Sequence, residues 1–381
     1  MRATRARGAI ASLAAVILAA AGAGCGGSSP TTRPPDPAAA AGPAATAAPV
    51  IGVAEPNAWR RSPAPATARR IAAKVTSLGA ESQRFVVDWS IAEPAPPGPE
   101  HRYRFEAFDQ MYRADVARGI RPLLVVMNAP VWAADPGAPR GSSANNPPAA
   151  SQLGDWAEFV GEVARRYPRV AGIEIWNEPN LAEFWGDGSA LVRPDPNRYA
   201  VLLEAGYDAV KSARPRTRVI GGALSSTATT TPAGDVAAAD FLRAVLTAGG
   251  AGHMDGLSLH PYPGEGEAER TLELIDRVRA VRDEAGATTS LWLTEVGVTT
   301  AGPAAASEAE QAATLVEICR EATSQPDIGA IYFHNLIEQP GPGIETGFGL
   351  LRPLPDGSLR RKPAYTALRR ELRAARACAG A

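Results

Sequence analysis

The regular alternation of short apolar runs with longer helical segments is the feature that most constrains this chain. Eight runs rich in β-branched residues are expected to form strands, namely Val50–Ala54, Gln83–Asp88, Arg121–Met127, Val170–Trp176, Thr217–Gly222, Asp255–His260, Ser290–Glu295 and Ile328–Phe333. Between them apolar residues recur at helical spacing, as in Trp156, Phe159 and Val163. Gly52 in the first run is isolated, so no glycine-rich phosphate-binding turn favours an open doubly wound sheet. The pattern predicts an α/β fold with a single (β/α)8 TIM barrel.

The first 24 residues have the pattern of an export signal. Arginines at the start precede a largely apolar run from Ala9 to Ala21, which is too short for a bilayer span of about 20 residues. Gly22, Ala23 and Gly24 then lead to Cys25, which resembles a bacterial lipoprotein processing site. We therefore expect an exported protein, extracellular or on the cell surface, with a lipid anchor at Cys25. Plain secretion with cleavage nearby is the alternative.

Residues 25–49 have the composition of a tether. They are almost entirely Gly, Ser, Thr, Pro and Ala, and they offer almost no large apolar side chain to bury. We expect three regions: a signal peptide at 1–24, a disordered tether at 25–49 and the barrel at 50–378. The anchor at Cys25 would be the chain's one contact with a membrane.

Two further cysteines lie near the end of the chain. Cys319 falls on an apolar stripe at helical spacing, and Cys378 follows in the last helical segment. Export into an oxidising compartment favours a disulfide between Cys319 and Cys378. A buried free thiol at Cys319 is the alternative.

The composition excludes several classes of function. The 381 residues contain 39 Lys and Arg against 40 Asp and Glu, so the basic surface of a nucleic-acid binder is not expected. Four scattered histidines give no metal motif, and neither a phosphate loop nor a nucleophile elbow occurs. We expect no metal, no cofactor and a monomeric chain.

Glutamates end two of the expected strands. The fourth strand runs on to Glu178, and alternation of side chains would direct Glu174, Trp176 and Glu178 into the barrel. In the seventh strand the same rule would direct Leu291, Leu293 and Glu295 inward. Because catalytic groups of a barrel sit at the carboxyl ends of its strands, both glutamates are expected at one mouth.

Two facing carboxylates suit the hydrolysis of glycosides. One protonates the departing oxygen, and the other attacks the anomeric carbon when the two lie about 5–5.5 Å apart. The acid needs a raised pKa, which burial beside a second carboxylate supplies.

The residues around both glutamates carry a family resemblance. Trp176-Asn177-Glu178-Pro179-Asn180-Leu181, with Glu183-Phe184-Trp185 after it, resembles the acid/base segment of clan A retaining glycoside hydrolases. It is most similar to family 39, with the cellulase-like family 5 as a neighbour, and Leu293-Thr294-Glu295-Val296-Gly297 resembles the nucleophile strand. The resemblance implies that Glu178 is the acid/base and Glu295 the nucleophile. It also implies that Asn177 binds the sugar 2-hydroxyl and that Arg84 supports the nucleophile, with a purely structural Arg84–Glu174 pair as the alternative.

Further residues are implied as parts of a sugar subsite. His260 and Tyr262 share one strand face, and the resemblance implies that the tyrosine donates to the nucleophile. Where clan members place a strand-eight Trp, this chain has Phe333 and His334 as possible substitutes. Candidates for stacking on a sugar are Trp132 and Trp185, both of which could instead be packing residues.

We therefore expect a retaining glycosidase that cleaves β-O-glycosidic bonds of xyloside- or glucoside-type oligo- or polysaccharides. One alternative is an endo-acting glucanase or mannanase like those of family 5. Another is a surface lipoprotein that binds polysaccharide without cleaving it. The loop between Asn128 and Ala150 would decide between exo and endo action, and the sequence does not say which.

Overall fold

The computed structural model describes residues 48–379, apart from 57–64, 139–144, 189–191, 227, 228, 232, 233, 264–266, 304 and 342, with side chains up to residue 374. The expected signal peptide and most of the expected tether, Cys25 included, lie outside these residues. Strand β1 begins at Val50, where the folded region was expected to start.

Eight parallel strands close into a barrel in sequence order, with β8 pairing back to β1. The strands are β1 (Val50–Ala54), β2 (Ser82–Asp88), β3 (Leu123–Met127), β4 (Gly172–Ile175), β5 (Val219–Ser225), β6 (Gly256–His260), β7 (Ser290–Val296) and β8 (Ile328–His334). This confirms the predicted (β/α)8 barrel, and every predicted strand overlaps an observed one.

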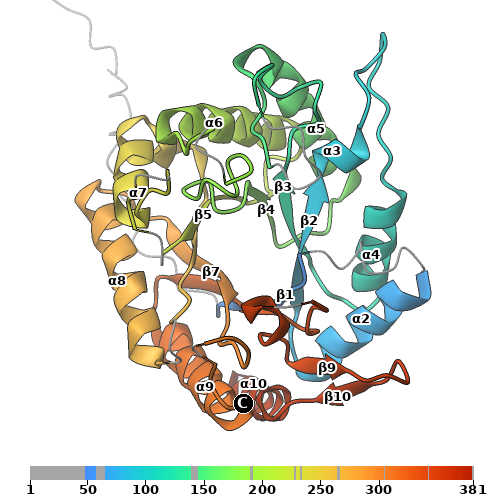
Figure 1. Ribbon diagram of the computed structural model, residues 1–381, viewed down its shortest axis with the longest axis vertical. Helices are drawn as coiled ribbons and strands as arrows, with labels where there is room; N and C mark the ends of the chain where they lie inside the picture. Colours follow the sequence, from blue (N-terminus) through green and yellow to red (C-terminus); the bar gives the residue numbers. More distant parts are fainter. Residues whose placement is uncertain are drawn as a thin grey trace, which may run out of the picture. The chain divides into compact units, whose positions relative to one another are not determined.

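Helices surround the strands, as Figure 1 shows. They are α2 (Pro65–Leu78), α3 (Trp89–Ala92), α4 (Glu106–Val116), α5 (Leu153–Arg166), α6 (Pro196–Ala213), α7 (Ala238–Thr247), α8 (Ala268–Glu284), α9 (Glu308–Ser324) and α10 (Pro363–Ala379). Short 3-10 helices are η1 (Ala150–Gln152), η2 (Gly250–His253) and η3 (Ile344–Thr346). A hairpin of β9 (Leu351–Pro353) and β10 (Leu359–Arg361) precedes α10.

The inside of the barrel is filled by its own side chains. A compact interior cluster contains Leu123, Ile220, Trp292 and Tyr332, all of them buried. Gly52 of β1 is required beside it, because a Cβ there would lie 2.3 Å from the Tyr332 ring. The barrel is therefore a packed core, and chemistry is confined to its mouth.

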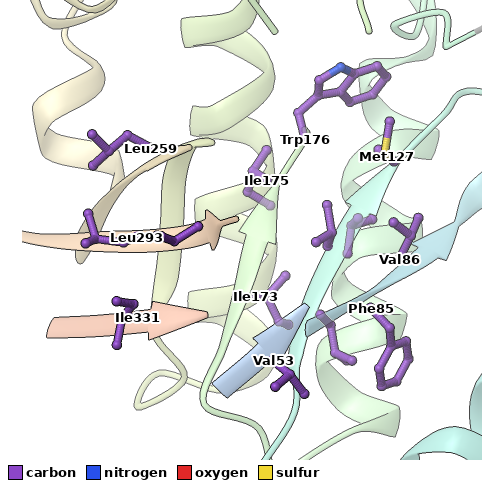
Figure 2. Close-up of a cluster of buried hydrophobic side chains, with 14 of the residues drawn as sticks. Val53, Phe85, Val86, Met127, Ile173, Ile175, Trp176, Leu259, Leu293 and Ile331 are labelled. Atoms are coloured by element: carbon purple, nitrogen blue, oxygen red, sulfur yellow. The ribbon is translucent and has the colours of Figure 1, made fainter. Parts of the chain in front are cut away.

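A second, larger core lies between the strands and the helices. Figure 2 shows part of it, including Phe85, Ile173 and Leu293. Apolar stripes of the helices cover this layer; in α5 the buried residues include Trp156 and Phe159. Within the described part of the chain, no helix has the length and apolar character needed to cross a membrane.

Cys319 lies in this layer, on the buried face of α9. It is a free cysteine, and burial raises the pKa of its thiol to about 12. A buried thiol at Cys319 is the alternative that the sequence left open, and the disulfide to Cys378 stays a prediction. The side chain of Cys378 lies outside the described residues.

Candidate active site

Glu178 lies in a turn just beyond β4. The strand ends at Ile175, and the backbone then becomes left-handed at Trp176 (φ 74°) and at Glu178 (φ 43°). Non-glycine residues rarely adopt such angles, and they persist where the surrounding structure holds them. Here the Glu178 amide donates to the carbonyl of Ala223 at 2.9 Å, which ties the turn to β5.

Trp176 does not point into the barrel, contrary to expectation. Its ring is buried in the outer core, where Nε1 donates to the Phe184 carbonyl at 2.7 Å and the ring packs edge-on against Trp185. Strand alternation stops at Ile175, so the left-handed turn rather than the alternation brings Glu178 to the mouth. Glu174, still within the strand, does face inward as expected.

The alternation expected for β7 is also wrong for two of its three residues. Leu291 and Leu293 pack in the outer core, whereas Trp292 belongs to the interior cluster. The register between β7 and β8 shifts between Leu293 and Val296, and such an irregularity re-aims the side chains that follow it. Glu295 therefore reaches the mouth even though the leucines before it face the helices.

Arg84 on β2 holds the floor of the site together. Its guanidinium is fully buried and donates to three side chains: to Glu174 from Nε at 2.6 Å, to Glu295 from Nη1, and to Asn177 from Nη2 at 2.7 Å. Burial works against its charge, but the two glutamates raise the pKa of Arg84 above its usual range. Arg84 thus contacts the expected nucleophile and also forms the Arg84–Glu174 pair.

Glu295 is surrounded by donors and positive charge. Tyr262 donates its hydroxyl to Glu295 Oε2 at 2.5 Å. Burial alone would raise the pKa of Glu295, but His334, His260, Arg84 and the Tyr262 hydroxyl together lower it well below its usual range. Burial and the nearby carboxylates raise the pKa of Tyr262, so its proton stays available. Glu295 is therefore held as an oriented carboxylate.

His260 connects the two glutamates. Its ring is fully buried, and Nδ1 lies 2.9 Å from Glu178 Oε1 and 3.9 Å from Glu295 Oε2. The two oxygens therefore lie no farther apart than 6.8 Å, the sum of 2.9 and 3.9 Å. On its other side, Nε2 lies 3.2 Å from the Thr294 hydroxyl. Glutamates 117 positions apart in the sequence thus meet at one point of the mouth.

His334 occupies the end of β8. Phe333, the other expected substitute for the missing Trp, packs in the outer core, while the His334 ring packs against both Tyr262 and Phe348. Its Nδ1 lies 3.4 Å from Glu295 Oε2. Alternation from Tyr332, whose side chain is inside the barrel, would have selected His334 over Phe333.

The remaining expected binding residues differ in their surroundings. Asn177 is nearly buried, and because its Oδ1 accepts from Arg84, its amide nitrogen is directed away from that contact. Trp132 is half-buried, with Nε1 donating to the Glu93 carbonyl at 3.0 Å. Trp185 is fully buried between Trp176 and Tyr199, so it is a packing residue and not a platform for a sugar.

A polar pair that the sequence analysis did not identify lies at the ends of β2 and β3. Asn128 donates from Nδ2 to Asp88 Oδ2 at 2.9 Å, and both side chains are more than nine-tenths buried. Asp88 is the last residue of β2 and Asn128 directly follows β3, each after an apolar run, and this was a usable sequence signal. Among the residues that the structure covers, no group of His, Cys, Asp and Glu is arranged to hold a metal ion.

Known structures share this architecture. A family 39 glycoside hydrolase from the gut symbiont Bacteroides cellulosilyticus has a TM-score of 0.66 at 24% identity, covering 85% of this chain and 64% of that one. A monomeric β-xylosidase from Caulobacter crescentus has a TM-score of 0.62 at 23% identity, covering 85% and 69%. An exo-β-1,4-mannosidase from an Opitutaceae bacterium has a TM-score of 0.61 at 18% identity, covering 87% and 60%. This chain thus spans less than two thirds of the first and third of these proteins.

Comparison by sequence adds nothing to this: no protein-family model matches the chain, and no curated protein does. The structural likenesses establish the fold, a (β/α)8 barrel that this chain shares with these solved glycoside hydrolases. Within that fold, the mouth holds Glu178 and Glu295. The buried His260 lies between them, and the pKa of Glu295 is lowered.

Proposed function

We propose that this protein is a retaining glycoside hydrolase that cleaves β-O-glycosidic bonds by double displacement. Glu295 is the nucleophile and Glu178 the general acid/base. The observation that carries the proposal is the bound of 6.8 Å between their oxygens, set by the 2.9 and 3.9 Å contacts to His260. Retaining enzymes hold their carboxyl groups about 5–5.5 Å apart, whereas inverting enzymes need about 6.5–9.5 Å to admit a water molecule. The bound of 6.8 Å admits the whole retaining range and only the lowest part of the inverting range.

In the first step the Glu295 carboxylate attacks the anomeric carbon. The bond to the departing oxygen breaks, and that oxygen takes the proton of Glu178, which leaves a glycosyl ester on Glu295 and a carboxylate on Glu178. The lowered pKa of Glu295 supports this assignment, because a nucleophile must be ionised while the acid keeps its proton.

In the second step water replaces the enzyme at the same carbon. Glu178 takes a proton from the water, the water oxygen bonds to the anomeric carbon, and Glu295 departs as a carboxylate. Two inversions at one carbon give overall retention. Arg84 and Tyr262 stabilise the negative charge that returns to the Glu295 carboxylate, because both donate hydrogen bonds to it.

Sugar recognition is proposed for Asn177, which directly precedes Glu178, and for Trp132, in the loop after β3. Asn177, with its Oδ1 fixed by Arg84, would donate from its amide nitrogen to the sugar 2-hydroxyl. Trp132, half-buried at the mouth, would form an aromatic surface for a sugar ring. Xylosides and glucosides are the first substrates to test, because a β-xylosidase is among the structural neighbours; mannosides follow, for the mannosidase neighbour.

Export with a lipid anchor at Cys25 remains part of the proposal. It is supported by the signal pattern and by a folded region that starts at residue 50. Metabolic labelling with a fatty acid would test it, using Cys25→Ala as the control that should take up no label.

Hydrolysis of nitrophenyl β-glycosides tests the function. Glu295→Gln should abolish turnover. Glu178→Ala should lower turnover by roughly 10²–10⁴-fold, the usual contribution of general acid–base catalysis. Azide, which needs no general base, should restore turnover in Glu178→Ala and give a β-glycosyl azide. Near-normal rates in both variants would refute the assignment, and tight oligosaccharide binding without hydrolysis of any substrate would favour a binding protein.

A further inference from the structure

His334 has an environment that the two-glutamate mechanism does not require. It ends β8 with only 4% of its surface exposed, and it packs edge-on against the rings of Tyr262 and Phe348 at centroid distances of 6.0 and 5.3 Å. Gly297 makes this closure possible, because a Cβ there would lie 2.6 Å from the His334 carbonyl oxygen. The imidazole is therefore fixed in orientation.

Both ring nitrogens of His334 face carboxylates. Nδ1 lies 3.4 Å from Oε2 of Glu295, and Nε2 lies 3.5 Å from Oε2 of Glu345 in η3. A neutral imidazole has one N–H, so it would present a lone pair to one of these carboxylates. Nδ1 makes no hydrogen bond to any described residue, so its contact with Glu295 is one of charge at ion-pair distance, and both carboxylates favour the imidazolium over the neutral ring. The arrangement therefore suits the charged form.

The other charged and titratable groups around the ring agree with this. Burial disfavours the charge, but Glu295, Glu345 and Glu55 raise the pKa of His334 above its usual range. Tyr262 faces the ring as a neutral donor that is already committed to Glu295. The three carboxylates that face His334 therefore favour its charged form beside the nucleophile.

This charge has different effects on the two steps of the proposed reaction. It stabilises the free carboxylate of Glu295, which makes attack on the sugar no easier. In the glycosyl-enzyme Glu295 is a neutral ester, and its departure regenerates the carboxylate next to the cation. A positive charge there favours the second step.

We propose that His334, held between Glu295 and Glu345, is a positioning residue that assists the departure of Glu295 from the glycosyl-enzyme. The inference rests on the proposed function. It assigns to Glu345, whose side chain is 59% exposed at the mouth, the role of keeping the imidazole charged and aimed.

The test compares two substrates of one sugar with His334→Phe. With a 2,4-dinitrophenyl glycoside the first step is fast, so kcat reports the second step. We expect kcat to fall about tenfold, the effect of one modest charge interaction, with KM falling alongside it as the glycosyl-enzyme accumulates. With a phenyl glycoside, kcat/KM reports the first step and should stay the same or rise. An equal fall in kcat/KM for both substrates, or no change in kcat, would overturn the proposal.

Glu345→Gln provides a second test that leaves the ring in place. Removing this carboxylate lowers the pKa of His334, so kcat for the dinitrophenyl substrate should decline at a lower pH than in the wild type. Glu317→Gln, which removes an exposed carboxylate from α9, is the matched control and should not move the profile. An unmoved profile in Glu345→Gln would overturn the role given to the pair. Failure of the wild type to hydrolyse any glycoside would instead refute the proposed function.

Discussion

Replacing Arg84 with Met should damage both stability and activity. The guanidinium is fully buried and donates to Glu174, Glu295 and Asn177. Its removal leaves Glu174 without its ion-pair partner and takes away one of the positive groups around Glu295. Breaking a buried ion pair from one side destabilises a protein by about 3–5 kcal/mol, and we expect Arg84→Met to lower the free energy of unfolding by that amount.

Urea denaturation followed by fluorescence measures this change directly. Arg84→Lys keeps the charge but lacks the planar fork that reaches three acceptors, so it should fall between the wild type and Arg84→Met. Arg165→Met is the control: it removes an exposed arginine paired with Glu162 and should change stability little. Combining Arg84→Met with Glu174→Leu should be less harmful than the sum of the two single changes, because the partners are coupled.

Activity should respond in a related way. Arg84 is one of the groups that lower the pKa of Glu295, so Arg84→Met should raise that pKa and shift the acidic side of the kcat/KM profile to higher pH. A loss of stability below about 1 kcal/mol together with an unchanged profile would refute the reasoning about this cluster.

Three further predictions concern single side chains. Tyr262→Phe removes a donor that lowers the pKa of Glu295, so activity should begin to fall at a higher pH on the acidic side; an unmoved kcat/KM profile would contradict this. Trp185→Ala should reduce stability by about 3–5 kcal/mol in denaturant titrations without changing KM, whereas Trp132→Ala should raise KM for oligosaccharides with little loss of stability. Burial raises the pKa of Asp115 well above normal, so above about pH 4 the native protein keeps a proton that the unfolded protein releases. The free energy of unfolding should therefore fall as the pH rises above about 4. Asp115→Asn should flatten that decline in denaturant titrations from pH 4 to pH 8.

The order of strands and helices was readable because each element carries its own period. In α8 the buried residues Leu274, Val278 and Val281 recur at helical spacing, and Gly286, at a φ of 69°, lies just past the helix end. Apolar spacing and helix ends are set by residues close together in the sequence, because each element buries one face against the same barrel. Strand ends agreed to within two residues except at the end of β5, which was expected at Gly222 and lies at Ser225.

Side-chain direction near the mouth was less predictable, for a physical reason. Alternation holds only while the backbone stays extended and in register. At Trp176 a left-handed turn ended it, and in β7 an irregular register with β8 displaced it. Both departures lie next to the glutamates, where loop contacts distant in sequence override the local period.

Contacts between strands could not be obtained from the pattern at all. The bridge from His260 to Glu178 and the link from His334 to Glu295 depend on how eight strands close into a ring. Trp185 was a candidate for sugar binding because it follows the segment that resembles the acid/base strand. Packing buries it completely, which the sequence pattern did not indicate.

Trapping the covalent intermediate tests the central claim most directly. The enzyme would be incubated with the 2-deoxy-2-fluoro, dinitrophenyl form of whichever β-glycoside it hydrolyses, because the fluorine slows release more than attack when the leaving group is good. Peptide mass spectrometry should then find one glycosyl group esterified to Glu295, and Glu295→Gln should take up none. Attachment to a different residue, or an inverted first product with no adduct at all, would contradict a double displacement at the two glutamates.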